Sequence, residues 1–152
     1  MEFYHVGIVV SNLDATASEF EQLLKVKWAA TQQREFRLST PNGFINTTIR
    51  FTYSKATTAG APLLELIEAV PGTPWWPGPN VRAALHHIGF WTDSLAEDAG
   101  RLQDAGARVV ASLVNDDGTP KVFTYQQLKN GPLVELIDSA HRKPVLAWVN
   151  AP

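Results

Sequence analysis

The sequence predicts an α+β fold in which two tandem βαβββ modules place curved, mixed sheets as a cup around a metal ion. The first observation is that three segments occur twice, in the same order along the chain. They are Tyr4–Val10 with His86–Thr92, Phe51–Tyr53 with Phe123–Tyr125, and Pro62–Glu68 with Pro132–Asp138. The second is that each copy carries a histidine near its start and a glutamate near its end. Segments that recur in a fixed order indicate two copies of one supersecondary unit.

Length, charge and composition limit the classes of protein to which the chain can belong. Its 152 residues suffice for one well-buried core, so we expect a single domain over residues 1–152. A formal net charge of −2 gives no electrostatic basis for binding nucleic acid or an acidic membrane. The absence of cysteine excludes disulfides, thiolate metal sites and a cysteine nucleophile. Since no apolar run reaches membrane-spanning length and no signal peptide is recognisable, we expect a cytoplasmic protein.

Module one is expected over residues 3–69. Its first strand, residues 3–10, alternates with a period of two. Ser11 then reads as a helix N-cap, and apolar residues follow it at helical spacing. Three further strands are expected after the helix, at residues 28–38, 44–54 and 62–69.

A proline-rich connector, residues 70–85, separates this module from module two at residues 86–139. The connector has four prolines in the nine residues 71–79, which predicts a rigid turn. Module two repeats the plan, with a helix that begins at Ser94 and ends before Gly106. Its later strands are expected near residues 107–114, 121–127 and 132–139, followed by a tail, residues 140–152, without a strong pattern.

Strand periodicity places the repeated histidines and glutamates on one face of the sheet. His5 and His87 lie on the face opposite the apolar residues that should contact a helix, and Glu65 and Glu135 share that helix-free face. A buried carboxylate needs a cationic partner or a metal. Two imidazoles and two carboxylates suit one divalent ion such as Zn, Ni, Co, Mn or Fe.

Each pair taken alone has a simpler interpretation, because a strand histidine is more often a satisfied or surface residue and a strand glutamate often faces solvent. The symmetric recurrence of both pairs favours the metal site. Gly7 and Gly89, two residues beyond each histidine, are expected to keep space open beside the ion. His86 falls on the opposite face by the same count, so we interpret it as structural.

Further residues of the helix-free face are candidates for substrate binding. In strand 44–54 the apolar alternation is expected to face the helix, which would leave Thr48 and Arg50 on the side of His5. Arg50 could clamp an anionic group, although a solvated strand arginine is an equally good interpretation. Trp91 shares the face of His87 and suggests a partly apolar substrate.

The paired His-Val/Ile-Gly and Glu-Leu-Ile-Glu/Asp segments resemble the vicinal oxygen chelate superfamily. This superfamily includes glyoxalase I, methylmalonyl-CoA epimerase, extradiol dioxygenases, fosfomycin resistance enzymes and bleomycin-binding proteins. The resemblance extends from residue 3 to about residue 139 and implies paired βαβββ modules that form a cup around a metal. It also implies that four residues occupy the metal-ligand positions: His5, Glu65, His87 and Glu135.

Within the superfamily, a His-Glu-His-Glu set resembles glyoxalase I. The run Leu85–Phe90 resembles methylmalonyl-CoA epimerase, but that family has Gln at the position of Glu65 and a catalytic Glu where this chain has Thr48. Extradiol dioxygenases use two His and one Glu, so Glu65 argues against their chemistry. Bleomycin-binding members lack the metal set.

We therefore expect a metal-dependent lyase or isomerase of glyoxalase I type that acts on a small carbonyl substrate through an enediolate. Glu135 or Glu65 would be the base. One alternative is a methylmalonyl-CoA epimerase-like enzyme. Another is a non-catalytic, bleomycin-resistance-like protein that sequesters a hydrophobic natural product, with stacking surfaces from Trp28, Trp75, Trp76 and Trp91. We also expect a homodimer, with the cup formed within one chain or across the dimer.

Overall fold

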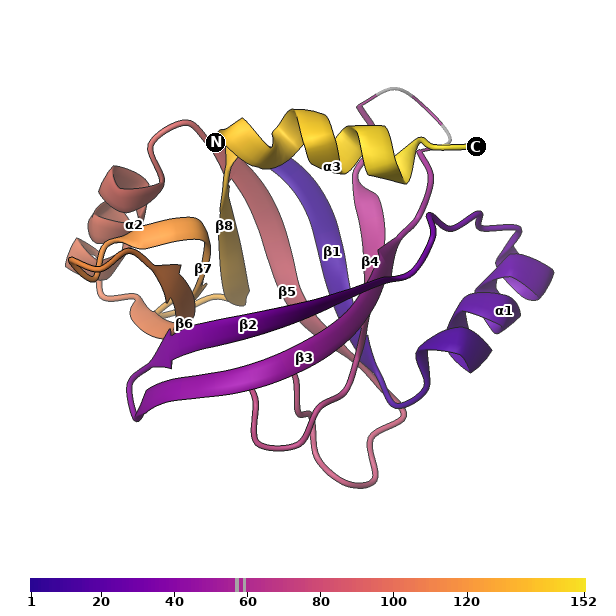
Figure 1. The fold of residues 1–152 in the computed structure, drawn as a ribbon, viewed down its shortest axis with the longest axis horizontal. Coiled ribbons are helices and arrows are strands. Elements are labelled where there is room, and N and C mark those ends of the chain that lie inside the picture. Colours follow the sequence, from indigo (N-terminus) through magenta and orange to yellow (C-terminus); the bar gives the residue numbers. More distant parts are fainter. Residues whose placement is uncertain (57, 59) are drawn as a thin grey trace.

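The computed structural model describes residues 1–56, 58 and 60–152 (Figure 1). The first half of the chain contains β1 (Glu2–Val10), α1 (Leu13–Leu24), β2 (Gln32–Thr40), β3 (Gly43–Tyr53) and β4 (Leu63–Glu68). The second half contains β5 (Ala83–Thr92), α2 (Leu95–Asp104), β6 (Arg108–Val114), β7 (Pro120–Gln127) and β8 (Leu133–Asp138). A 3₁₀ turn at Ser139–His141 leads into α3 (Arg142–Val149).

The strands form one mixed sheet that closes on itself in the order β1-β4-β3-β2-β6-β7-β8-β5. Each half repeats one pattern, in which the first strand is parallel to the fourth and the remaining neighbours are antiparallel. β1 and β5 join the halves along most of their length, whereas β2 and β6 meet through the pair Ser39 and Ser112. The predicted α+β class, with two βαβββ units and a curved mixed sheet, is confirmed.

Helices α1 and α2 cover the outer side of the sheet on opposite flanks (Figure 1). The apolar stripe of α1 packs through Leu13 against Val10 and Leu66, which have no solvent exposure. The N-cap of α1 is Asn12, whose side chain accepts a hydrogen bond from the backbone N–H of Ala15. The prediction of Ser11 as the cap was therefore wrong by one residue.

The C-terminal segment is a helix, where the sequence indicated a tail without a pattern. α3 runs across one end of the sheet (Figure 1), and its Val149 is fully buried in the central core. Trp148 packs edge-on against Phe51 and Tyr53. The proline of α3, Pro144, stands in the first turn, where a missing backbone N–H costs little. None of the helices in the described part of the chain has the length and apolar character needed to cross a membrane.

Candidate metal centre

The register of the four central strands brings the repeated histidines and glutamates together. In the antiparallel pair β1–β5, His5 lies opposite Gly89 and Gly7 lies opposite His87. In the parallel pairs, Gly7 lies beside Glu65 of β4. In the parallel pair β5–β8, Gly89 likewise lies beside Glu135 of β8. Each glycine therefore has a histidine on one side and a glutamate on the other, and the four side chains meet within one chain.

The four donor atoms have the spacing of a coordination shell. The Nε2 atoms of His5 and His87 are 2.8 Å apart. The Oε2 atoms of Glu65 and Glu135 lie 3.2–3.4 Å from these two nitrogens, and one ligand atom of each residue lies within 4.8 Å of all the others. With bonds of about 2.1 Å, neighbouring ligand atoms are about 3.0 Å apart in an octahedron and about 3.4 Å apart in a tetrahedron. These side chains thus fit a divalent ion.

The burial of the cluster supports the same conclusion. All four side chains are buried, and the two Oε2 atoms accept no hydrogen bond from the described residues. Burial opposes charge on both histidines, but Glu65 and Glu135 outweigh it, so that the pKa of His5 is raised and that of His87 is raised to about 9. Burial likewise opposes charge on the glutamates, but the histidines hold the pKa of both carboxyls below the usual value. A divalent cation bound by the four donors would supply positive charge to balance the two carboxylates.

The glycines make room for the histidines, which corrects the prediction that they keep space open beside the ion. A Cβ atom on Gly7 would lie 2.0 Å from Cε1 of His87, and one on Gly89 would lie 2.2 Å from Cε1 of His5. Each imidazole therefore lies directly over the glycine of the neighbouring strand. Any side chain at either position would displace a candidate ligand.

A cavity of about 400 Å³ opens onto the cluster from inside the sheet. Glu65, Glu135 and Trp91 line it, the last as predicted from periodicity. Nine of its twenty lining residues are aromatic: Tyr4, Phe36, Phe51, Tyr53, Trp75, Trp91, Phe123, Tyr125 and Trp148. The cavity can therefore hold an apolar or aromatic group next to the four ligand atoms.

Arg50 and Thr48 face away from this cavity, so the prediction that they lie on the side of His5 was wrong. The Arg50 guanidinium donates to the carboxylates of Asp14 and Glu68 at 2.9–3.1 Å, which ties α1 to β4 on the outer side. Thr48 is exposed on the outside of β3. The reason is that the inner wall is itself apolar, so the apolar face of β3 turns inward. Among the described residues, the arginine that lines the cavity is Arg34, on β2.

Two of the four tryptophans considered for stacking do not line the cavity. Trp28 packs beside α1 and donates its Nε1–H to the backbone oxygen of Ala17. Trp76 lies at the surface. Trp148, on α3, contributes to the wall and was missed because no helix was predicted there.

Three tyrosines surround the cluster and were not predicted as site residues. The rings of Tyr53 and Tyr125 stand edge-on to His5 and His87, with centroids 5.2 and 5.0 Å apart. They are the last residues of the repeated Phe-Thr-Tyr segment, so the repeat was a signal for them. Tyr4 is also inside, and its hydroxyl has no partner among the described residues. Burial and the glutamate charges raise the pKa of all three phenols.

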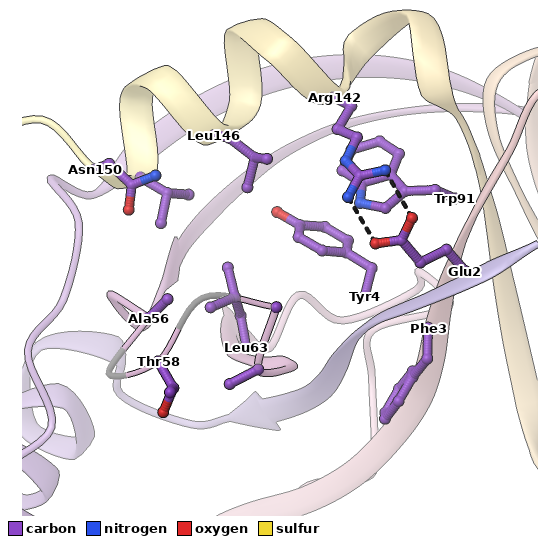
Figure 2. Close-up of a pocket in the computed structure, with 13 residues that line it drawn as sticks. Glu2, Phe3, Tyr4, Ala56, Thr58, Leu63, Trp91, Arg142, Leu146 and Asn150 are labelled. Atoms are coloured by element: carbon purple, nitrogen blue, oxygen red, sulfur yellow. Dashed lines mark hydrogen bonds and ion pairs between the residues drawn. The ribbon is translucent and has the colours of Figure 1, made fainter.

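A second cavity, of about 350 Å³, lies beneath α3 (Figure 2), and Tyr4 and Trp91 line both cavities. Figure 2 shows Arg142 of α3 paired with Glu2 at its edge, with both carboxylate oxygens accepting from the guanidinium at 2.6–2.7 Å. Leu63 and Leu146 face each other across it. Because the candidate ligands do not line it, we place the chemistry in the first cavity.

His86 contacts the cluster, although periodicity placed it on the opposite face. The pairing of β1 with β5 skips one residue between Leu85 and His87, so that His86 forms a β-bulge. Its Nδ1 lies 2.9 Å from Nδ1 of His87, and its Nε2 lies 2.9 Å from the backbone oxygen of Pro74. Burial, followed by the charge of His87, lowers the pKa of His86. Tyr4 is skipped in the same way in β1, which explains its inward position.

Comparison with known proteins supports this fold. The family model described as "Glyoxalase/Bleomycin resistance protein/Dioxygenase superfamily" matches residues 4–125. The chain is 29% identical over 138 residues to an ethylmalonyl-CoA/methylmalonyl-CoA epimerase of Cereibacter sphaeroides, a match that covers 87% of this chain and 93% of the relative.

Solved structures share the fold. A Streptomyces coelicolor methylmalonyl-CoA epimerase variant in complex with 2-nitronate-propionyl-CoA is 24% identical and superposes with a TM-score of 0.64, covering 92% of this chain and 98% of that one. The methylmalonyl-CoA epimerase of Mycobacterium tuberculosis is 19% identical, with a TM-score of 0.58, covering 90% of this chain and 87% of that one.

Proposed function

The chain belongs to the glyoxalase/bleomycin resistance protein/dioxygenase superfamily, and from this premise we propose that it is a metal-dependent isomerase or lyase of glyoxalase I type. Its reaction would remove a proton from a carbon next to a carbonyl group in a small substrate. The observation that carries the proposal is the set of four buried donors at one end of an aromatic cavity. His5, Glu65, His87 and Glu135 would hold one divalent ion.

The chain's own residues supply the proton acceptor and the binding surface. A bound divalent ion supplies a Lewis acid that polarises a substrate carbonyl. Glu65 and Glu135 are the carboxylates that line the cavity, among the residues with described positions, so one of them would accept the proton. The aromatic wall excludes water and holds an apolar part of the substrate.

The relatives support the isomerase kind of reaction. Epimerisation of an acyl-CoA thioester also begins with loss of a proton next to a carbonyl, so the epimerases named above fall in the same reaction class. In this chain, however, Thr48 is exposed on the outside of β3 and Ile49 faces the cavity. No carboxylate of β3 therefore lines the described cavity wall, which favours a candidate ligand carboxylate as the base.

The test is solvent deuterium exchange at the carbon next to a carbonyl, measured by NMR on a panel of 2-oxo acids and acyl thioesters. Protein loaded with Zn, Ni, Co, Mn or Fe should catalyse exchange with at least one compound, and treatment with a chelator should abolish it. Metal-loaded protein that exchanges no compound of the panel would overturn the enzymatic proposal.

A binding protein is the second candidate, because nine of the twenty residues that line the cavity are aromatic. A protein that sequesters a hydrophobic compound needs no metal for binding. Quenching of tryptophan fluorescence by aromatic ketones separates the two functions, since Trp75 and Trp91 line the cavity. Tight binding that is unaffected by a chelator, together with no exchange, would favour sequestration.

A further inference from the structure

We propose that His86 is a positioning residue that fixes the tautomer and ring orientation of His87. The inference rests on the proposed metal site and adds a residue to it. His86 stands in the β-bulge of β5, which turns its side chain toward the inside of the sheet beside His87. The two ring contacts of His86, one to His87 and one to Pro74, carry the argument.

The backbone oxygen of Pro74 determines the direction of both hydrogen bonds. A carbonyl oxygen only accepts, so Nε2 of His86, 2.9 Å away, must carry the proton that is donated to it. In a neutral imidazole the other nitrogen is then an acceptor. Nδ1 of His86 therefore accepts from Nδ1–H of His87, at 2.9 Å. In the neutral form that binds a metal, the lone pair of His87 is thereby placed on Nε2, the atom that faces His5 and the two glutamates.

The acceptor carbonyl belongs to a rigid part of the chain. Pro74 lies in the proline-rich connector, where the backbone N–H of Val70 donates to the backbone oxygen of Trp75 at 3.2 Å. The Trp75 side chain is 1% exposed and packs in the central core. Thr73 closes the turn by donating from Oγ1 to the backbone oxygen of Val70 at 2.7 Å. The connector thus holds the oxygen that orients His86, and through it His87.

The other half of the chain lacks this arrangement. Tyr4 occupies the matching bulge before His5, and its ring stands edge-on to that imidazole. Nδ1 of His5 is buried without a hydrogen-bond partner among the described residues. Ligand histidines generally donate their second ring N–H to an outer acceptor, and loss of such an acceptor typically lowers metal affinity by roughly 10–100-fold. For His87, that outer acceptor is Nδ1 of His86.

Three substitutions separate the hydrogen bond to His87 from packing. His86→Asn keeps an oxygen near the position of Nδ1, whereas His86→Gln keeps a donor for Pro74 but moves the acceptor away; His86→Phe removes both. Zinc affinity, measured by competition with a chelator, should fall roughly 10–100-fold for Gln and Phe and only a few-fold for Asn. Equal losses in Asn and Gln, or no loss in Phe, would overturn the proposal.

NMR on metal-free, ¹⁵N-labelled protein tests the hydrogen bond directly. We expect a ¹⁵N–¹⁵N coupling between the Nδ1 atoms of His86 and His87, and its loss in His86→Gln. A proton on Nε2 of His87 with a bare Nδ1 would overturn the proposal. If wild-type protein binds no metal, the proposed function fails, and the coupling alone still decides whether His86 holds His87.

Discussion

Adding one methyl group at Gly89 should remove His5 from the candidate metal centre. A Cβ atom there would lie 2.2 Å from Cε1, 2.5 Å from Nδ1 and 2.7 Å from Nε2 of His5, whereas ordinary contacts of a Cβ atom are 3.4–4 Å. The imidazole must therefore move by about 1 Å, and metal–ligand distances tolerate only about 0.2 Å. His5 is fully buried between the ring edges of Tyr4 and Tyr53, so it has little room to return.

The loss of His5 as a ligand should lower zinc affinity by about 100-fold or more in Gly89→Ala, since even an outer-sphere partner contributes roughly 10–100-fold. A hundredfold change corresponds to about 2.8 kcal/mol. Competition with a chelator measures this change, and thermal unfolding in the same buffer with chelator shows whether the fold persists.

Gly100→Ala is the matched control for the change at Gly89. Gly100 lies inside α2, and a Cβ atom there meets no described atom within 4 Å. This variant should keep its zinc affinity and gain up to about 1 kcal/mol of stability from helix propensity. If Gly89→Ala folds and binds zinc as tightly as wild type, His5 does not hold the metal in the way described.

Three further predictions concern the base, the pH dependence and the outer ion pairs. If one glutamate both binds the metal and accepts the proton, either Glu135→Gln or Glu65→Gln should lose roughly 10²–10⁴-fold in deuterium exchange, while the other variant retains it; equal, small losses in both would contradict a carboxylate base. Because the pKa of His87 is raised from 6.5 to about 9, the folded metal-free protein binds a proton that the unfolded chain has lost between these values. Its free energy of unfolding should therefore fall, and its zinc affinity rise, as the pH increases from about 6.5 to about 9; denaturant melts and chelator competition that stay flat would contradict this. Arg50→Gln should lower the free energy of unfolding by about 1 kcal/mol in denaturant melts and leave zinc affinity unchanged, because its ion pairs lie outside the cavity and are partly exposed; a change in zinc affinity would place Arg50 in the site.

The positions of the four candidate ligands could be predicted because strand geometry and the repeat both constrain them. Alternation fixes which face of its own strand a residue such as His5 or Glu65 occupies, and the recurrence of the same pattern 70 or more residues later places His87 and Glu135 symmetrically. The identity of the residue beneath each imidazole depends on the register between β1 and β5, which the sequence does not reveal.

The errors have three physical causes. An aromatic cavity makes the inner wall as apolar as a helix-covered face, so hydrophobic alternation in β3 cannot tell which way Arg50 and Ile49 point. A β-bulge breaks alternation at a single residue. Tyr4 and His86 occupy such bulges and therefore point inward, although strict alternation would place them on the outer face. α3 is eight residues long and contains a proline, so its helical pattern is weak in the sequence although Val149 is fully buried.

Anomalous X-ray diffraction from crystals of the zinc- or cobalt-loaded protein tests the proposed metal centre most directly. We predict one strong anomalous peak per chain, about 2.0–2.2 Å from Nε2 of His5, Nε2 of His87 and a carboxylate oxygen each of Glu65 and Glu135. A crystal in which the metal is bound elsewhere, or in which these four side chains bind to one another with no peak between them, would contradict it.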